Sequence, residues 1–228
     1  MAAIAAAPVI PPHAWTTYHH DLAKIQLQKP IVDNKESLYK VPLQELNCSF
    51  DVVTTLPEMQ PLQHVVKQHA KHNHADVTIM YAIRQPSCPS CREHGLQLQE
   101  FAAHDRKLAL VGAVKETGVA DQEILAFYQR FFRNPIYKDP KWNVYKALGG
   151  HKISIRSTVL GIFRSMKRFH EKGIPLFHSG PAGESFLQGG ILIFDKHGNL
   201  RYTYNEEFKE YDMDLVAAAV AETRRLAN

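Results

Sequence analysis

The sequence predicts an α/β protein whose central mixed sheet is flanked by helices. Two almost continuously apolar stretches, Val77–Ile83 and Leu108–Val114, are typical of buried strands that are covered on both faces. Each is followed by a segment with helical spacing, and a strand–turn–strand pattern precedes the last helix. Alternating strands and helices of this kind favour a single α/β layer domain.

The length and composition fit this expectation. The chain has 228 residues, of which 45% are hydrophobic, so it can build a core and is too apolar to be disordered. Its net charge of +4 is mixed along the chain, whereas a nucleic-acid binder usually carries a dense basic stripe. We therefore expect no nucleic-acid partner. Three cysteines are too few for a secreted disulfide framework, which favours a reducing, cytoplasmic location.

The N-terminal part carries the weakest signals. Residues 1–30 are expected to form a poorly ordered arm, because prolines interrupt an alanine-rich start that has no preceding basic residue. Residues 31–228 are expected to form one domain. Within it, a short hairpin is predicted inside 37–53, and a helix over 62–72.

From Asp76 onward the predicted elements follow one another closely. Pro86 ends the first buried strand, and Cys88-Pro89-Ser90-Cys91 opens a helix that runs to about Ala103. After the second buried strand we expect, in order, a helix at 120–132, a short strand at 136–137, a short helix at 140–148, a helix at 157–171, strands at 190–194 and 200–204, and a helix at 213–226.

The helix predicted at 157–171 is an insertion before the C-terminal hairpin. One face carries five apolar side chains: Val159, Ile162, Phe163, Met166 and Phe169. Basic residues lie on its other side or at its end, which is the pattern of a helix that covers a core and exposes a solvated basic face. We prefer this interpretation to contact with a membrane surface.

The pair Cys88 and Cys91 carries the predicted chemistry. Pro89 suits the first turn of a helix, which places Cys88 at or near the N-cap. There, unpaired N–H groups and the helix dipole lower a thiol pKa from about 8.5 toward 7 or below. Helical spacing turns Cys91 toward the core and leaves Cys88 more open to solvent. We predict Cys88 as the attacking thiolate, Cys91 as the resolving thiol and Arg92 as an added positive charge.

Two other interpretations of the cysteines stay open at this point. They could be ordinary core residues, or they could bind zinc together with His94 and Cys48. A structural zinc site usually brings a second, regularly spaced ligand pair, and none is visible, so we expect no metal. The histidine-rich stretch from His64 to His74 is interpreted as a solvated helix end.

Residues 82–93 (AIRQPSCPSCRE) resemble the redox segment of the peroxiredoxin-like 2 family, which is grouped with the AhpC/TSA antioxidant enzymes. Three further segments resemble the family in the same order: VGAVKE at 111–116, NPIYKDPKWNVYKALGG at 134–150 and FLQGGILIF at 186–194. The resemblance extends over roughly residues 75–205. It implies a thioredoxin-like fold and a thiol oxidoreductase or antioxidant activity.

The resemblance also implies the partners. The substrate would be a small peroxide, a lipid peroxide or a protein disulfide, and the electron donor a thiol reductant such as thioredoxin. No cofactor would be bound, and reducing equivalents would come from NADPH through the thioredoxin or glutathione systems. One relative is a prostamide/prostaglandin F synthase that reduces a lipid endoperoxide, which is an alternative function. A non-catalytic redox-sensing or binding module is another.

The sequence departs from related motifs at two places. True peroxiredoxins carry P-x-x-x-[TS]-x-x-C, and when that motif is aligned on Cys91, Arg84 and Cys88 occupy the Pro and Thr positions. That alignment makes Cys91 the peroxidatic equivalent, whereas the N-cap argument selects Cys88. Thioredoxins place a cis-proline before the strand that faces the redox pair, where this chain has Gln188-Gly189-Gly190.

Overall fold

The computed structural model describes residues 35–49, 52–115, 121–150, 152, 154–175, 187–206 and 209–227. The arm predicted at 1–30 lies outside these residues. The elements are α1 Lys35–Tyr39, β1 Pro42–Ser49, β2 Val52–Pro61, α2 Leu62–His72, β3 Val77–Ile83, α3 Pro89–Ala103, β4 Leu108–Lys115, α4 Asp121–Arg130, β5 Ile136–Asp139, α5 Asn143–Ala147, α6 Ile155–Glu171, β6 Gly190–Asp195, β7 Leu200–Asn205 and α7 Met213–Ala227.

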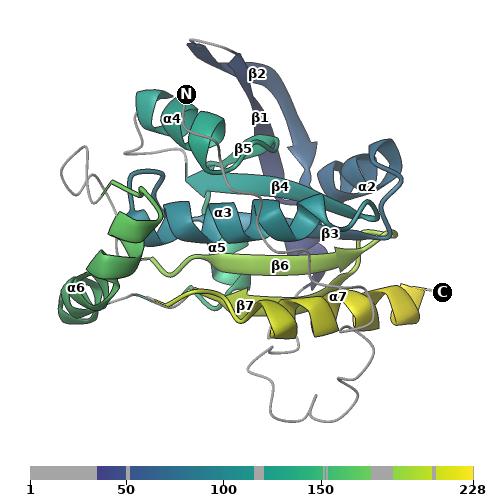
Figure 1. Cartoon of the computed structure of the whole chain (residues 1–228). Helices are drawn as coiled ribbons and strands as arrows, with labels where there is room; N and C mark the ends of the chain where they lie inside the picture. The colour runs from purple at the N-terminus through teal and green to yellow at the C-terminus, as the bar shows by residue number, and fades with distance from the viewer. Residues whose placement is uncertain are drawn as a thin grey trace, which may run out of the picture.

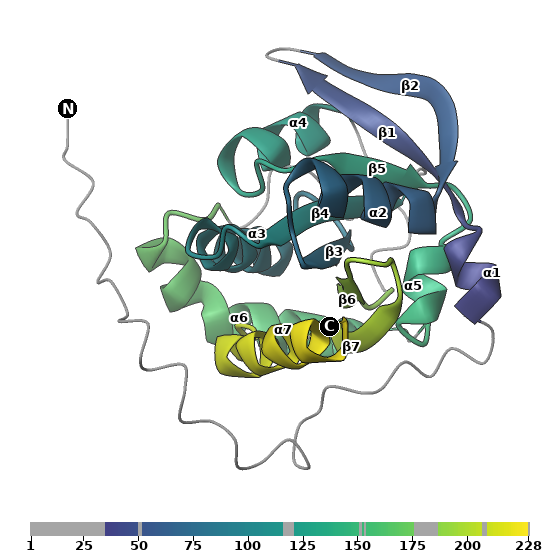
Figure 2. The same ribbon diagram turned by 90° about the vertical axis from the view of Figure 1, so that its right-hand side faces the viewer.

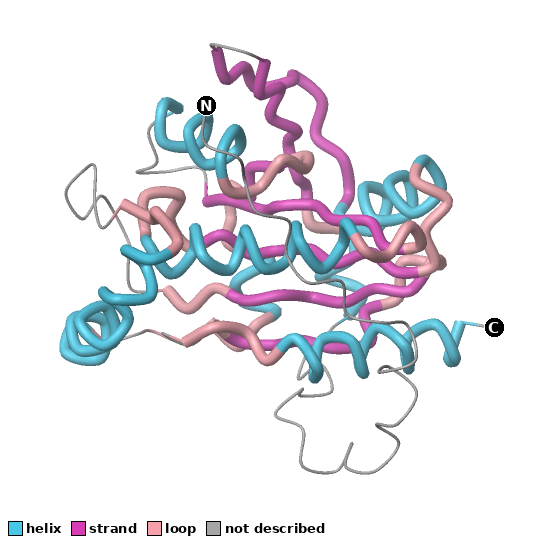
Figure 3. The backbone as a smooth tube through the Cα atoms, in the orientation of Figure 1, coloured by secondary structure: helices cyan, strands magenta, loops and turns pink. Residues whose placement is uncertain are grey.

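The sheet is mixed and has seven strands in the order β2-β1-β5-β4-β3-β6-β7 (Figures 1 and 3). Strand β3 pairs in parallel with β4 and antiparallel with β6, and β6 pairs antiparallel with β7. The β3–α3–β4 crossover and the β6–β7–α7 unit therefore share one four-strand core. This arrangement confirms the predicted thioredoxin-like fold, with β1, β2 and β5 extending the sheet beyond β4.

Two apolar cores lie on opposite faces of the sheet, because side chains alternate along each strand. In β3, Ile79 and Tyr81 face the core under α3, α4 and α7, while Met80 and Ala82 face the core under α1, α2 and α5. Figure 2 shows these two layers of helices from the side. The continuous apolar composition of β3 and β4 is thereby explained, since both strands are buried along their whole length.

The structure differs from the prediction at the N-terminal hairpin. Residues 37–39 belong to helix α1, and the hairpin runs from Pro42 to Pro61, so it is longer than the predicted span within 37–53. Strand β1 also pairs with β5, which places the hairpin at the edge of the main sheet. The sequence did not predict this pairing because β1 and β2 contain many polar residues. A hairpin at the edge of a sheet lacks the apolar runs of a central strand.

The prediction for helix α6 was wrong in one respect. The helix forms, but among its predicted apolar face only Phe169 is fully buried, while Phe163 is 66% exposed. Val159 and Met166 are exposed as well. The helix lies at the end of the molecule beyond the sheet, so it contacts the core mainly through its last turns (Figure 1). Amphipathic spacing predicts a helix, but not that its apolar face finds a partner.

Candidate active site

The cysteine pair begins helix α3 at the carboxyl end of β3. Cys88 is the N-cap residue with an extended backbone, and Pro89 occupies the first helical turn, as predicted. The Cys88 carbonyl accepts the first helical hydrogen bond, from the Arg92 N–H at 3.0 Å. The free N–H groups of the first turn thus surround the Cys88 side chain with positive potential.

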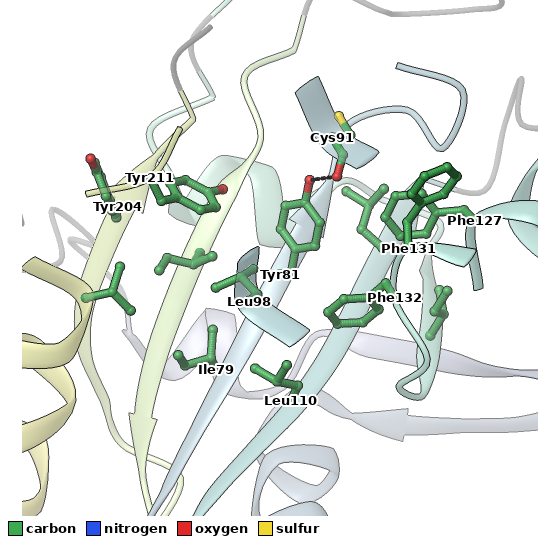
Figure 4. Close-up of a cluster of buried hydrophobic side chains, with 14 of the residues drawn as sticks. Ile79, Tyr81, Cys91, Leu98, Leu110, Phe127, Phe131, Phe132, Tyr204 and Tyr211 are labelled. Atoms are coloured by element: carbon green, nitrogen blue, oxygen red, sulfur yellow. Dashed lines mark hydrogen bonds between the residues drawn. The ribbon is translucent and has the colours of Figure 1, made fainter. Parts of the chain in front are cut away.

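Both thiols are buried, which corrects the expectation that Cys88 is open to solvent. Cys88 is 4% exposed and Cys91 is fully buried. Cys88 is therefore the more exposed of the two, as predicted, but it is not open to solvent. Cys91 sits on top of the apolar core, with its sulfur directed away from the aromatic side chains beneath (Figure 4). The Tyr81 hydroxyl donates to the Cys91 carbonyl at 3.0 Å and joins the first turn of α3 to β3.

Arg84 supplies the direct positive charge at the thiol. Its Nη2 donates to the Cys88 Sγ at 2.7 Å and lies 3.5 Å from the Glu206 Oε1. Sequence reasoning did not select Arg84 as a functional residue. The signal was present, because the peroxiredoxin motif aligned on Cys91 puts Arg84 at its proline position, four residues before Cys88.

Arg92, the basic residue that the sequence did select, is placed differently. Its guanidinium donates to the carbonyls of Pro86 at 3.0 Å and Pro175 at 3.2 Å, and it lies over the Phe131 ring. These contacts fix the loop before Cys88 against the segment after α6. Arg92 thus positions the loop, and the structure assigns the contact with the sulfur to Arg84.

The electrostatics of the site separate the two thiols. A hydrogen bond from the Cys91 thiol lowers the pKa of Cys88 to about 6, with a further contribution from the Arg84 charge, and these outweigh burial. Burial, followed by the hydrogen bond to Cys88 and the charge of its thiolate, raises the pKa of Cys91 well above its ordinary value. At neutral pH the pair therefore holds one thiolate, on Cys88, and one protonated thiol, on Cys91.

Glu206 faces Cys91 from the end of β7. Its carboxylate oxygens lie 3.8 Å and 3.9 Å from the Cys91 Sγ, and the Glu206 N–H donates to the Gly189 carbonyl at 2.8 Å. A Cβ at Gly189 would stand 2.5 Å from the Ala82 carbonyl oxygen and 2.6 Å from the Glu206 Oε2. Glycine is therefore required where the Gly-Gly segment passes the site.

Several buried polar atoms beside the cysteines have no hydrogen-bond partner among the described residues. They are the hydroxyls of Ser87, Ser90 and Tyr211, and the Nδ1 of His94. Leaving a buried polar group unsatisfied costs about 1–3 kcal/mol each. Such atoms are rare in folded proteins, and their concentration around one pair of thiols is typical of a reaction site that admits a polar substrate.

The zinc alternative finds no support in the placement of His94. Its Nε2 bonds the Lys209 carbonyl at 2.7 Å, and its ring stacks on Tyr211. Across the parts of the chain that the structure describes, no three His, Cys, Asp or Glu side chains form a metal-binding group. The side chain of Cys48 lies outside the described residues.

In the histidine-rich stretch, His69 differs from the predicted solvated end, since it is half-buried and bonds the Tyr137 hydroxyl at 2.8 Å.

An ion-pair network ties the site helix to α6. The fully buried side chain of Glu93, two residues after Cys91, accepts from the Arg168 Nε at 2.6 Å and its Nη2 at 2.8 Å. Lys172 lies 3.0 Å from the same carboxylate and also pairs with Glu210. Each buried carboxylate oxygen thus has a cationic donor, which anchors α6 to the first turns of α3.

We expect Arg168→Ala to lower the free energy of unfolding by about 1–3 kcal/mol, because Glu93 keeps Lys172 but loses two charge-assisted hydrogen bonds. Urea denaturation measures this change. Lys167→Ala is the matched control on the same helix: its side chain is 90% exposed and pairs with Glu171 at 3.9 Å. Its effect should stay within about 0.5 kcal/mol. Equal losses in the two variants would contradict the anchoring role.

With this geometry established, the chain can be compared with known proteins. The family described as AhpC/TSA antioxidant enzyme matches residues 97–207. The match spans just under half of the chain and resembles the family noted from the sequence. The matched segment contains Glu206 but begins six residues after Cys91. The interpretation of the cysteine pair therefore depends on the geometry described above.

Solved structures with a similar fold include three bacterial proteins. A Xanthomonas campestris bacterioferritin comigratory protein is 14% identical, with a TM-score of 0.46 over 89% of this chain and 99% of its own. A peroxiredoxin-like protein from Aquifex aeolicus is 12% identical, with a TM-score of 0.42 over 80% and 83%. A secreted Mycobacterium tuberculosis disulfide oxidoreductase is 12% identical, with a TM-score of 0.40 over 64% and 81%. No curated protein matches the sequence.

Among the helices in the described ranges, none is both long and apolar enough to cross a membrane.

Proposed function

We propose that the protein is a thiol oxidoreductase that reduces peroxides or disulfides through Cys88 and Cys91. The observation that carries this proposal is the contact between the Arg84 guanidinium and the Cys88 sulfur, 2.7 Å long and buried beside a protonated second thiol. A thiolate is the reactive form of cysteine, and a neighbouring thiol is what releases a product bound to it.

The reaction has two steps. With a peroxide, the Cys88 thiolate attacks one oxygen, the O–O bond breaks, and the departing oxygen leaves as an alcohol or as water. The resulting sulfenic acid condenses with the Cys91 thiol, which forms the Cys88–Cys91 disulfide and releases water. With a disulfide substrate, Cys88 forms a mixed disulfide and Cys91 then displaces the second thiol.

The reduced pair must be regenerated by a thiol reductant. We propose thioredoxin or glutathione for this role, with electrons that come from NADPH, and the cytoplasm as the compartment. The partner-docking alternative without catalysis would be favoured instead if the disulfide, once formed, resisted a cellular thiol reductant.

The test is a count of thiols in the Cys48→Ser protein before and after one equivalent of oxidant. We expect both remaining thiols to disappear together, with a mass loss of two hydrogens, and to return when dithiothreitol is added. A protein that also carries Cys88→Ser and Cys91→Ser is the control for unrelated oxidation. Thiols that persist in the folded protein, under conditions that oxidise the unfolded chain, would contradict the proposal.

A lipid endoperoxide or lipid hydroperoxide as substrate is favoured by one observation. Leu160 and Phe163 of α6 are exposed, and the basic residues Arg164 and Lys167 are exposed beside them. Such a surface suits an amphipathic anion. If this surface recognises the substrate, the thiol count should fall faster with a fatty-acid hydroperoxide than with hydrogen peroxide. Equal rates would contradict a lipid preference and support only a general peroxide activity.

A further inference from the structure

Once Cys88 has bonded to substrate, Cys91 needs a new proton acceptor. In the reduced protein the Cys88 thiolate accepts a hydrogen bond from the Cys91 thiol. After the first step Cys88 carries no charge, and that acceptor is lost. Cys91 is fully buried, so water does not take the proton directly. Attack by Cys91 nevertheless requires its thiolate.

Glu206 is placed to accept this proton. Its side chain is 1% exposed, and its two oxygens lie 3.8 Å and 3.9 Å from the Cys91 Sγ. The backbone of Glu206 is fixed on both sides, since its N–H donates to the Gly189 carbonyl and its carbonyl accepts from the Gln188 side-chain Nε2 at 2.7 Å. A buried carboxylate held beside a buried thiol costs folding free energy, which indicates a function at this position.

His94 offers the next position for the proton. A carbonyl oxygen accepts hydrogen bonds but cannot donate them, so the contact with the Lys209 carbonyl places the hydrogen of neutral His94 on Nε2. The buried Nδ1 then carries a lone pair that has no hydrogen-bond partner among the described residues, and it lies 3.8 Å from the Glu206 Oε1. The lone pair therefore faces the oxygen that would receive the proton.

The other groups around Glu206 determine when it acts. Arg84 faces it from the end of β3 at 3.5 Å, and the hydroxyls of Tyr81 and Tyr211 interact with its charge from β3 and from the segment before α7. Before reaction, Arg84 divides its charge between the Cys88 sulfur and Glu206. The two thiols and the carboxylate thus share one cation, which keeps the proton on Cys91 until Cys88 reacts.

We propose that Glu206 is a catalytic residue that takes the proton from the Cys91 thiol during disulfide closure, with His94 as the adjoining relay. In this step the Cys91 sulfur attacks the Cys88 sulfur, the bond between Cys88 and its substituent breaks, and the substituent leaves with the electron pair. The proton moves from Cys91 to Glu206 and, through the Nδ1 of His94, on to the departing hydroxide or thiolate, or to solvent. The inference rests on the proposed oxidoreductase function.

The two steps can be observed in one stopped-flow trace with dithiobis-nitrobenzoate, an aromatic disulfide whose released thiolate is coloured. In the Cys48→Ser background, attack by Cys88 releases one equivalent and closure by Cys91 releases the second. We expect Glu206→Gln to change the first phase by less than about threefold and to slow the second about tenfold or more. The second phase should also become steeply dependent on hydroxide, which a merely structural effect would not produce.

Two further variants and the unsubstituted protein make the result decisive. Glu206→Asp keeps a carboxylate and should recover part of the second phase, which also covers the case in which Glu206→Gln does not fold. Glu210→Gln is the matched control, because Glu210 pairs with Lys172 and should leave both phases unchanged. An unchanged second phase in Glu206→Gln overturns the inference about Glu206 alone, whereas the absence of the first phase in the unsubstituted protein overturns the oxidoreductase function itself.

Discussion

Cys88→Ser should reduce peroxide or disulfide turnover by about 100-fold or more, to the rate of the uncatalysed reaction. The reason is that a serine hydroxyl does not ionise at neutral pH, whereas the surroundings of Cys88 lower the pKa of its thiol to about 6. The loss should be seen both in steady-state consumption of NADPH, coupled through thioredoxin and its reductase, and in a single turnover without reductant.

Cys91→Ser should give a different loss. The first step is retained, so one equivalent of oxidant is consumed and Cys88 accumulates as a sulfenic acid or a mixed disulfide, which mass spectrometry detects. Steady-state turnover falls because no internal thiol releases the product. Both variants should be compared in the Cys48→Ser background, with Cys48→Ser alone as the control.

The opposite pattern would reverse the roles of the two cysteines. If Cys88→Ser kept the rapid first step and Cys91→Ser lost it, Cys91 would be the nucleophile, as the peroxiredoxin motif aligned on that residue implies. The structure argues against that order, since Cys91 is fully buried and burial raises the pKa of its thiol. The single variants therefore decide between two assignments that the sequence left in conflict.

The core of the fold was predictable because its signals are local. The apolar runs at Val77–Ile83 and Leu108–Val114 specify buried strands, and Pro89 after Cys88 specifies the start of a helix. The N-terminal hairpin was less predictable, because β1 and β2 pair at the edge of the sheet and half of their side chains are polar. Burial of only one face leaves a weak pattern in the sequence.

The candidate site was predictable only where it is continuous in the chain. Cys88 and Cys91 are identified by spacing, but Glu206 reaches Cys91 across 115 residues through the pairing of β7 with β6 and of β6 with β3. Arg84 is close to Cys88 in sequence, but the direction of its side chain depends on where β3 ends. The charge of Arg92 does interact with Cys88, as predicted, but Arg84 makes the direct contact. Helix spacing does not reveal which of two nearby arginines turns toward the sulfur.

Replacing Arg84 tests the electrostatics of the site most directly. With a Cys88 pKa of about 6, about 90% of the thiol is ionised at pH 7. If Arg84→Met returned that pKa to the ordinary value of about 8.5, only about 3% would be ionised, so the first step at pH 7 should slow by up to about 30-fold. The hydrogen bond from Cys91 persists in the variant, so 30-fold is the upper bound.

The sign of the pH dependence follows from the same shift. A thiol with a lowered pKa keeps its thiolate, and its reactivity, down to about pH 6 and loses both below it. In Arg84→Met the profile should move toward higher pH. The two proteins should converge above about pH 9, where the Cys88 thiol is largely ionised in each of them. Ultraviolet thiolate absorbance, followed against pH in the Cys48→Ser background, measures the shift independently of any substrate.

Two further variants separate charge from stability. Removing Arg84 leaves the Glu206 carboxylate buried without the cation 3.5 Å away, which destabilises the fold, so Arg84→Lys is needed to retain the charge. We expect it to recover much of the thiolate at pH 7. Arg106→Met removes an equal charge from an exposed position beyond the far end of α3 and should leave the profile unchanged. If the pH profiles of Arg84→Met and the unsubstituted protein coincide, the N-terminus of α3 and Cys91 stabilise the Cys88 thiolate without the Arg84 guanidinium.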